Sequence, residues 1–136
     1  MTKAEKVLTV GGLLTLAYGT LLGYPLVILR MGNGTPPAPR YLDVAHVGAV
    51  VQGAILLGLV WAAHMSELSQ GWNTTAAWLV VIAGILIAIK DTVNWLTGVN
   101  DEFAEHSRTA PLGVAGATTM TVGLAIFIIG VLAELF

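Results

Sequence analysis

The chain has 136 residues, of which 56% are hydrophobic and only 10% are charged, and its mean hydropathy is +0.81. A soluble domain of this size could not bury so many apolar side chains, and an average one is about a quarter charged. The formal net charge of −2 argues against nucleic acid as a partner, and the absence of cysteine excludes a disulfide scaffold, a thiolate metal site and c-type haem. The composition therefore predicts an all-α integral membrane protein.

Four segments without charged residues follow one another along the chain, at 7–29, 44–63, 76–89 and 110–133. A membrane helix needs about 20 residues to cross about 30 Å of hydrocarbon, so all but the third are long enough as they stand. We expect a four-span helix bundle forming one domain over residues 1–136, with both termini on the same side of the bilayer. The first segment carries no carboxylate, which argues against a proton-coupled multidrug exporter.

The third segment must extend at one end to cross the membrane. It could start a few residues earlier, with Asn73 or Thr74 as its N-cap. It could instead continue through Lys90 and Asp91, which places an ionisable pair inside or at the edge of the membrane. Such a pair is costly unless the protein shields or uses it. We predict a span over 74–98.

The three histidines have different settings. His46 lies three residues into the second segment, where it is either a satisfied interfacial residue or a haem or metal ligand, because neutral imidazole is the commonest metal-binding side chain. His64 follows five helical turns later, about 27 Å away at 1.5 Å per residue, so one haem cannot bridge the two. We expect His64 at the membrane interface and His106 in a solvated, acidic connector.

Other polar residues within the spans also need an explanation. Gln52 lies in the middle of the second span, where its amide either bonds a neighbouring helix or points into a ligand cavity. Lys90, Asp91 and Asn94 share the end of the third span. They form either a helix end, with Lys90 reaching towards the interface and Asp91 paired to a connector residue, or the polar wall of a buried site.

Glycines recur at regular spacing in the first and last spans. The first carries Gly19 and Gly23, a GxxxG pair, and the last carries Gly116, Gly123 and Gly130 at intervals of seven, which keeps them on one stripe of a helix. Such a stripe either packs the bundle or presents a smooth surface to a second subunit or a flat cofactor. Because four short helices make a thin bundle, we expect an oligomer in either case.

The stretch RYLDVAHVGAVVQGAILLGLVW, beginning at Arg40, resembles the second helix of bacterial hydroxylaminobenzene mutases, which are relatives of the styrene oxide isomerases. In both, an Arg precedes an Ala-His pair, and an amide-Gly pair follows six residues after the His. The segment TVNWL at 92–96 resembles the Asn-Trp-Leu segment of the mutase third helix. The resemblance covers roughly residues 40–98, together with the four-span layout and the short chain.

This resemblance implies a small membrane homotrimer, in the bacterial inner (cytoplasmic) membrane, whose four-helix subunits hold haem b near the subunit contacts. His46 matches the axial iron ligand of that family. Arg40 and Gly53, which flank it in the matching stretch, are implied to help bind the cofactor. One protein ligand leaves the opposite face of the iron open for substrate.

The resemblance also implies a reaction. Gln52 stands where the family usually has Asn, and Asn94 matches the third-helix Asn, so both would orient substrate or stabilise the departing oxygen. Lys90 or Asp91 would move the proton. The epoxide isomerases carry a Tyr one turn after that Asn, whereas this chain has Gly98, which favours the mutase side of the family.

The expected activity is therefore the conversion of a small aromatic substrate, an arylhydroxylamine such as hydroxylaminobenzene, to a 2-aminophenol, with ferric haem as Lewis acid and no net redox change. Three alternatives stay open. They are an epoxide isomerase of the styrene oxide type, a non-enzymatic b-type cytochrome or haem sensor, and an accessory membrane subunit without cofactor. The cytochrome would normally need two axial ligands, and the spans contain one histidine well inside an apolar segment.

Overall fold

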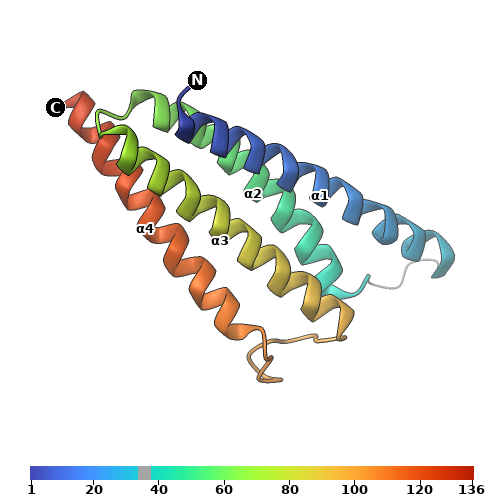
Figure 1. The fold of residues 1–136 in the computed structure, drawn as a ribbon. Coiled ribbons are helices and arrows are strands. Elements are labelled where there is room, and N and C mark those ends of the chain that lie inside the picture. The colour runs from blue at the N-terminus through green and yellow to red at the C-terminus, as the bar shows by residue number, and fades with distance from the viewer. Residues whose placement is uncertain (34–37) are drawn as a thin grey trace.

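The computed structural model describes residues 1–33 and 38–136. These form four helices, α1 (Lys3–Asn33), α2 (Arg40–Met65), α3 (Gln70–Leu96) and α4 (Ala110–Leu135). Each helix is long and apolar enough to cross a membrane, which confirms the predicted all-α, four-helix architecture and indicates a multi-pass membrane protein. Both termini lie at the same end of the bundle, as an even number of spans requires (Figure 1).

The third helix, α3, is longer than the charge-free segment 76–89 at both of its ends. It begins after Ser69, which is the N-cap residue, so the prediction that Asn73 or Thr74 caps the helix is wrong. Asn73 lies inside the helix, where its amide donates a hydrogen bond to a backbone carbonyl just before the helix, at 3.0 Å. At the other end α3 continues through Lys90 and Asp91, and the ionisable pair is part of a helix that is long and apolar enough to cross a membrane.

The first helix begins earlier than its charge-free segment and therefore includes a carboxylate, that of Glu5. Its side chain is largely buried at the terminal end of the bundle, where Oε2 accepts a hydrogen bond from the Thr2 backbone N–H at 3.0 Å. Oε1 lies 3.3 Å from Nδ1 of His64 in the last turn of α2. Glu5 thus belongs to the end of the helix, whereas the residues 7–29 within the span carry no acid.

The helices do not form a closed ring. The helices α1, α2 and α3 contact one another, whereas α4 packs on α3 and, over a shorter stretch, on α2. Within the described residues α1 and α4 share no contact, and they lie at opposite edges of the bundle (Figure 1). The larger apolar core cluster comprises Ala4, Leu8, Leu56, Ala63, Ala76, Ala77, Val80, Val81 and Phe127.

The glycine stripe of α4 packs against the rest of the bundle. Gly116, Gly123 and Gly130 are buried. A Cβ atom built on Gly123 would lie 2.6 Å from Cγ1 of Val80, and one on Gly116 would lie 2.9 Å from Cγ1 of Ile87, both on α3. Close packing of membrane helices depends on such small residues. The interpretation that the stripe packs the bundle is confirmed, and these glycines face α3 and the α2–α3 connector.

The first two connectors are shorter than the charge pattern predicts, because helix extends into them, whereas α3 begins four residues before the predicted span 74–98 and ends two residues before that span does. The predicted loop 30–43 is helical up to residue 33 and again from residue 40, and residues 34–37 lie outside the described part of the chain. The second connector is reduced to 66–69, and the third covers 97–109. Pro111 stands in the first turn of α4, where proline is well tolerated.

Candidate functional site

The imidazole of His46 is held between α2 and α1. Its Nδ1 atom lies 2.8 Å from the backbone carbonyl oxygen of Gly19. A carbonyl oxygen only accepts, so Nδ1 carries the proton, and the lone pair of the neutral ring is on Nε2. A Cβ atom on Gly23 would lie 3.2 Å from Cε1 of His46. Gly23 of the GxxxG pair therefore leaves room for the imidazole, and the carbonyl of Gly19 determines which ring nitrogen carries the proton.

His46 also lines an apolar groove of about 420 Å³ on the outer side of the bundle. Its other lining residues come from α1. Among them Tyr24 and Ile28 are 65% and 67% exposed, so the groove opens away from the subunit's own core. The remaining lining residues are Thr20, Gly23, Leu26 and Val27.

The residues at this groove fit a haem. Metal-binding histidines usually donate their second ring N–H to a carbonyl or carboxylate, which orients the ring, and His46 makes that contact. A cofactor site is mostly apolar, and the side chains that line this groove with His46 are mostly apolar as well. The described residues contain no group of three or more His, Cys, Asp or Glu side chains placed to hold a bare metal ion.

The other two residues assigned to the cofactor have structural contacts in this subunit. Gly53 is buried against α1, where an added Cβ atom would lie 2.6 Å from Cγ of Leu16 and 2.9 Å from the Gly12 carbonyl oxygen. Arg40 stands exposed at the start of α2 and donates to the Asn100 carbonyl oxygen at 3.0 Å. The lining of the His46 groove includes neither of them.

Gln52 faces α3 rather than α1. A Cβ atom on Gly84 would lie 2.9 Å from Cγ and 3.2 Å from Nε2 of Gln52, so this glycine makes the room that the amide occupies. Within the described chain Nε2 is buried and has no hydrogen-bond partner. A buried, unpaired amide is unfavourable by about 1–3 kcal/mol. Within the described residues Oδ1 of Asn73 and Oδ1 of Asp91 share this unpaired state with Gln52.

The ionisable pair of α3 is joined by a third charged residue. Nζ of Lys90 lies 2.8 Å from Oε2 of Glu102 in the third connector and 3.1 Å from Oδ1 of Asp91. The latter contact lacks hydrogen-bond geometry, although Asp91 is only 4% exposed. The same Nζ lies 5.9 Å from the ring centre of Tyr41. The contacts match a helix end with the partners exchanged, because Lys90 rather than Asp91 pairs with a connector residue and one ammonium group is shared by two carboxylates.

Asn94 completes this polar cluster. Its side chain is fully buried, and its Oδ1 atom accepts hydrogen bonds from the hydroxyls of Ser107 at 2.7 Å and Thr109 at 2.6 Å. Its Nδ2 atom donates to Oε2 of Glu102 at 3.2 Å. Three of its hydrogen bonds thus fasten the 97–109 connector to the end of α3. We call Lys90, Asp91, Asn94, Glu102, Ser107 and Thr109 the connector cluster.

The structure does not gather the predicted site residues into one pocket. His46 lies on the α1 side of α2, Gln52 on the α3 side, and Lys90, Asp91 and Asn94 in the connector cluster. Two contributors had not been predicted. Tyr24 lines the His46 groove, and its position directly after Gly23 of the GxxxG pair could have indicated this. Glu102 had no such signal, because an irregular connector has no periodicity to reveal which side chain turns inward.

The remaining histidines lie apart from the groove. The side chain of His64 is 65% exposed at the end of α2, as expected for an interfacial residue. His106 is exposed in the third connector. Comparison of the chain with protein-family models, with curated proteins and with solved structures finds no match.

Proposed function

We propose that the protein is a membrane haem b isomerase in which His46 is the axial iron ligand. The observation that carries this proposal is the hydrogen bond from His46 Nδ1 to the Gly19 carbonyl. It holds the ring beside an apolar groove and leaves the lone pair of Nε2 available to bind iron. The resemblance of the stretch around His46 to the hydroxylaminobenzene mutases supplies the reaction class. We further propose a homotrimer in the bacterial inner membrane.

A single ligand favours an enzyme over an electron-transfer cytochrome. In the described residues no second histidine lines the groove. His64 is separated from His46 by 18 residues of continuous helix, about 27 Å. A haem held by His46 alone has one open face, which is what a catalytic site requires and what a two-ligand cytochrome lacks.

Bound ferric haem would supply a Lewis acid for the N–O oxygen of an arylhydroxylamine. The protein's own residues then have to hold the ring, exclude water and keep the hydroxyl near the ortho carbon. The apolar side chains of the groove serve the first two purposes. The reaction is an isomerisation and needs no other reactant. The N–O bond breaks and an ortho C–O bond forms, while the ortho carbon loses a proton and the nitrogen gains one.

We assign the polar substrate contacts first to Tyr24, whose phenol lines the groove together with His46. Gln52, Asn94, Lys90 and Asp91 do not line it, so the catalytic roles that the resemblance gives them stay predictions. Tyr24 also supports a second candidate function. A tyrosine hydroxyl is what the third span lacks for epoxide isomerisation, and α1 offers one beside His46.

The test begins with the colour of the protein purified in detergent after haem-replete expression. We expect a Soret band and about one haem per subunit in the wild type and in His64→Ala, and its loss in His46→Ala. Gly23→Leu, which crowds the imidazole, should also lower haem content. Wild type without a Soret band, or His46→Ala with full haem, would refute the assignment.

Activity is then measured with phenylhydroxylamine and with styrene oxide, without reductant. Formation of 2-aminophenol supports the mutase, and formation of phenylacetaldehyde supports the epoxide isomerase. Tyr24→Phe should lower turnover while leaving the haem spectrum unchanged. Haem-loaded protein that converts neither substrate would leave the cytochrome as the better interpretation.

A further inference from the structure

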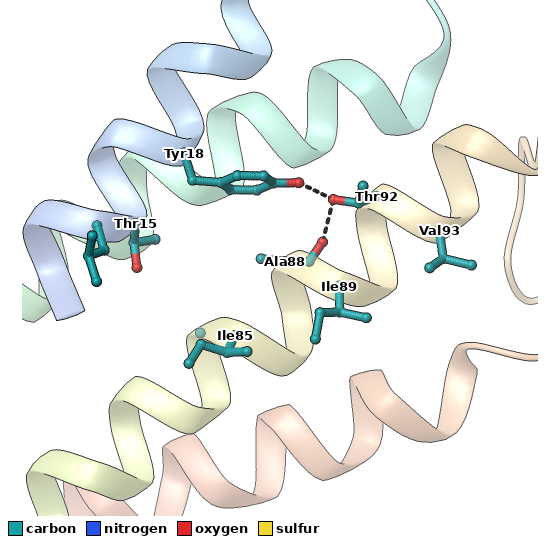
Figure 2. Close-up of a pocket in the computed structure, with 9 residues that line it drawn as sticks. Thr15, Tyr18, Ile85, Ala88, Ile89, Thr92 and Val93 are labelled. Carbon is teal, nitrogen blue, oxygen red and sulfur yellow. Dashed lines mark hydrogen bonds between the residues drawn. The ribbon is translucent and has the colours of Figure 1, made fainter.

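A second groove, separate from that of His46, lies between α1 and α3. The cavity between Tyr18 on α1 and Ile85 on α3 has a volume of about 420 Å³ and is almost entirely apolar. Figure 2 shows how it ends in polar groups, where the hydroxyl of Tyr18 on α1 meets that of Thr92 on α3. Thr92 also donates to the Ala88 carbonyl oxygen at 2.6 Å. These hydroxyls bond one another and the helix, so the groove presents hydrocarbon to whatever fills it.

The groove continues towards the terminal end of the bundle. A neighbouring cavity, also of about 420 Å³, shares Leu14, Thr15 and Ile85 with the first and reaches Lys6 and Trp78. Trp78 in turn borders a smaller cavity of about 280 Å³. The three cavities follow one another along the outside of α1 and α3, and we call them together the α1–α3 groove.

The length of the α1–α3 groove matches one leaflet of a membrane. From Lys6 at one end to Tyr18 at the other, α1 advances by about 18 Å at 1.5 Å per residue. Half of the hydrocarbon core is about 15 Å thick. An acyl chain entering beside Lys6 would thus reach the Tyr18 hydroxyl near the middle of the bilayer.

The mouth of the groove favours an anion. Lys3 and Lys6 border it with exposed side chains, and the first turn of α3, which includes Gly71, forms its other wall. This helix N-terminus has no acidic residue in its first turn and no side-chain cap, so no residue of that turn offsets its partial positive charge. The nearby carboxylate of Glu5 is engaged by Thr2 and His64.

We propose that the α1–α3 groove binds one anionic phospholipid, with an acyl chain along Leu14 and Ile85 and the phosphate between Lys3 and Lys6. The long apolar lining of the groove matches an acyl chain. The ammonium groups of Lys3 and Lys6, together with the N-terminus of α3, favour a negatively charged headgroup over a zwitterionic one. Each cation near a membrane surface strengthens the binding of anionic lipid by about fivefold. Trp78 stands at the boundary between chain and headgroup, the usual depth of an interfacial tryptophan.

The proposal is tested on the full chain in detergent by native mass spectrometry, with phosphatidylglycerol and phosphatidylcholine of identical acyl chains. We expect one phosphatidylglycerol per subunit, bound about 10- to 30-fold more tightly than phosphatidylcholine, and weaker binding at high salt. Lys3→Gln/Lys6→Gln should abolish this preference. The matched control Arg30→Gln/Arg108→Gln, which removes two cations from the other end of the bundle, should keep it.

A second pair of variants tests the acyl chain. Ile85→Trp fills the groove and should lower the affinity for phosphatidylglycerol at least fivefold, whereas Ile129→Trp, on the exposed side of α4, should not. Circular dichroism and gel filtration establish that each variant folds. Should Ile85→Trp fail to fold, the exposed lysine pair alone decides the outcome.

Three results would overturn the proposal. They are equal affinity for the two lipids, unchanged affinity in Ile85→Trp, and dissociation of an oligomer by Ile85→Trp with unchanged lipid binding. The last result would show that a second copy of the chain covers the groove.

Discussion

The side-chain amide oxygen of Asn94 lies 2.6 Å from the hydroxyl of Thr109, 15 residues further along the chain, and both groups are buried. One residue inside a membrane-spanning helix thus fixes the start of the next helix. Its partners include a carboxylate, and hydrogen bonds to charged groups are the stronger ones. This geometry gives Asn94 a role in holding the fold, whatever part it takes in chemistry.

Replacing Asn94 by Ala should lower the free energy of unfolding by about 2–4 kcal/mol, because two hydroxyls and a carboxylate lose a buried partner at once. The measurement is reversible unfolding in detergent followed by circular dichroism. Asn100→Ala, on an exposed connector residue, should change the stability by no more than about 0.5 kcal/mol. Unchanged stability of Asn94→Ala would contradict the structural role.

Replacing Gly123 by Ala should separate α4 from α3. The added methyl group meets Cγ1 of Val80 at 2.6 Å and the Ala76 carbonyl oxygen at 3.1 Å, and overpacking of this kind destabilises by about 1–3 kcal/mol. Gly58→Ala is the matched control, because nothing lies within 4 Å of its added Cβ and alanine favours a helix by about 1 kcal/mol over glycine. The two variants should therefore shift the unfolding midpoint in opposite directions.

Replacing Lys90 by Met should be among the most destabilising changes, by about 3 kcal/mol, because it removes the cation that the carboxylates of Asp91 and Glu102 share. The double variant Lys90→Met/Glu102→Gln removes one of the two carboxylate charges that Lys90→Met leaves without a cation, and it should recover part of the loss. A double-mutant cycle measures this coupling. Strictly additive effects would show that the ion pair contributes nothing of its own.

The third connector should loosen in acid through Asp101. The backbone N–H groups of Ala104 and Phe103 donate to its carboxylate at 3.0 Å each, and with the positive charge of Arg40 they lower the pKa of Asp101 below its usual value. A carboxyl whose pKa is lower in the folded chain stabilises it above the unfolded pKa of about 3.9, and this stabilisation is lost as the pH falls through the folded pKa.

Amide hydrogen exchange of the 101–104 turn, measured from pH 5 to pH 3, checks this expectation. Protection should fall towards the lower end of the range in the wild type. Asp101→Asn should show lower and nearly pH-independent protection over the same range. A wild-type turn whose protection does not change down to pH 3 would contradict it.

Much of the fold can be predicted from the segments of the sequence that lack charged residues. The helices occur where charge-free segments predict them, since backbone polar groups in hydrocarbon must be satisfied within a helix. The boundaries differ by a few residues because residues such as Lys3 and Gln70 extend helices beyond their apolar parts. Glu5 joins α1 for this reason, and the charge pattern alone could not show its contact with His64.

The sites are predicted less completely than the helices. His46, Gln52 and Asn94 stand out in the sequence because polar groups inside spans are rare and expensive. Their partners do not stand out, because Gly19 precedes His46 by 27 residues and Glu102 lies in an irregular connector. Spacing along one helix places residues on a common face, but it does not say which neighbouring helix that face meets.

The sequence by itself determined that this chain forms four helices long and apolar enough to cross a membrane, and which few polar residues they must accommodate, because hydropathy and helix length depend on local composition. Only the tertiary structure decided that His46 donates to α1, that Gln52 lies against Gly84 of α3 and that Asn94 fastens the connector. Those outcomes depend on how each helix is rotated about its axis, and that rotation is set by the packing of glycines such as Gly53 and Gly123 against their neighbours.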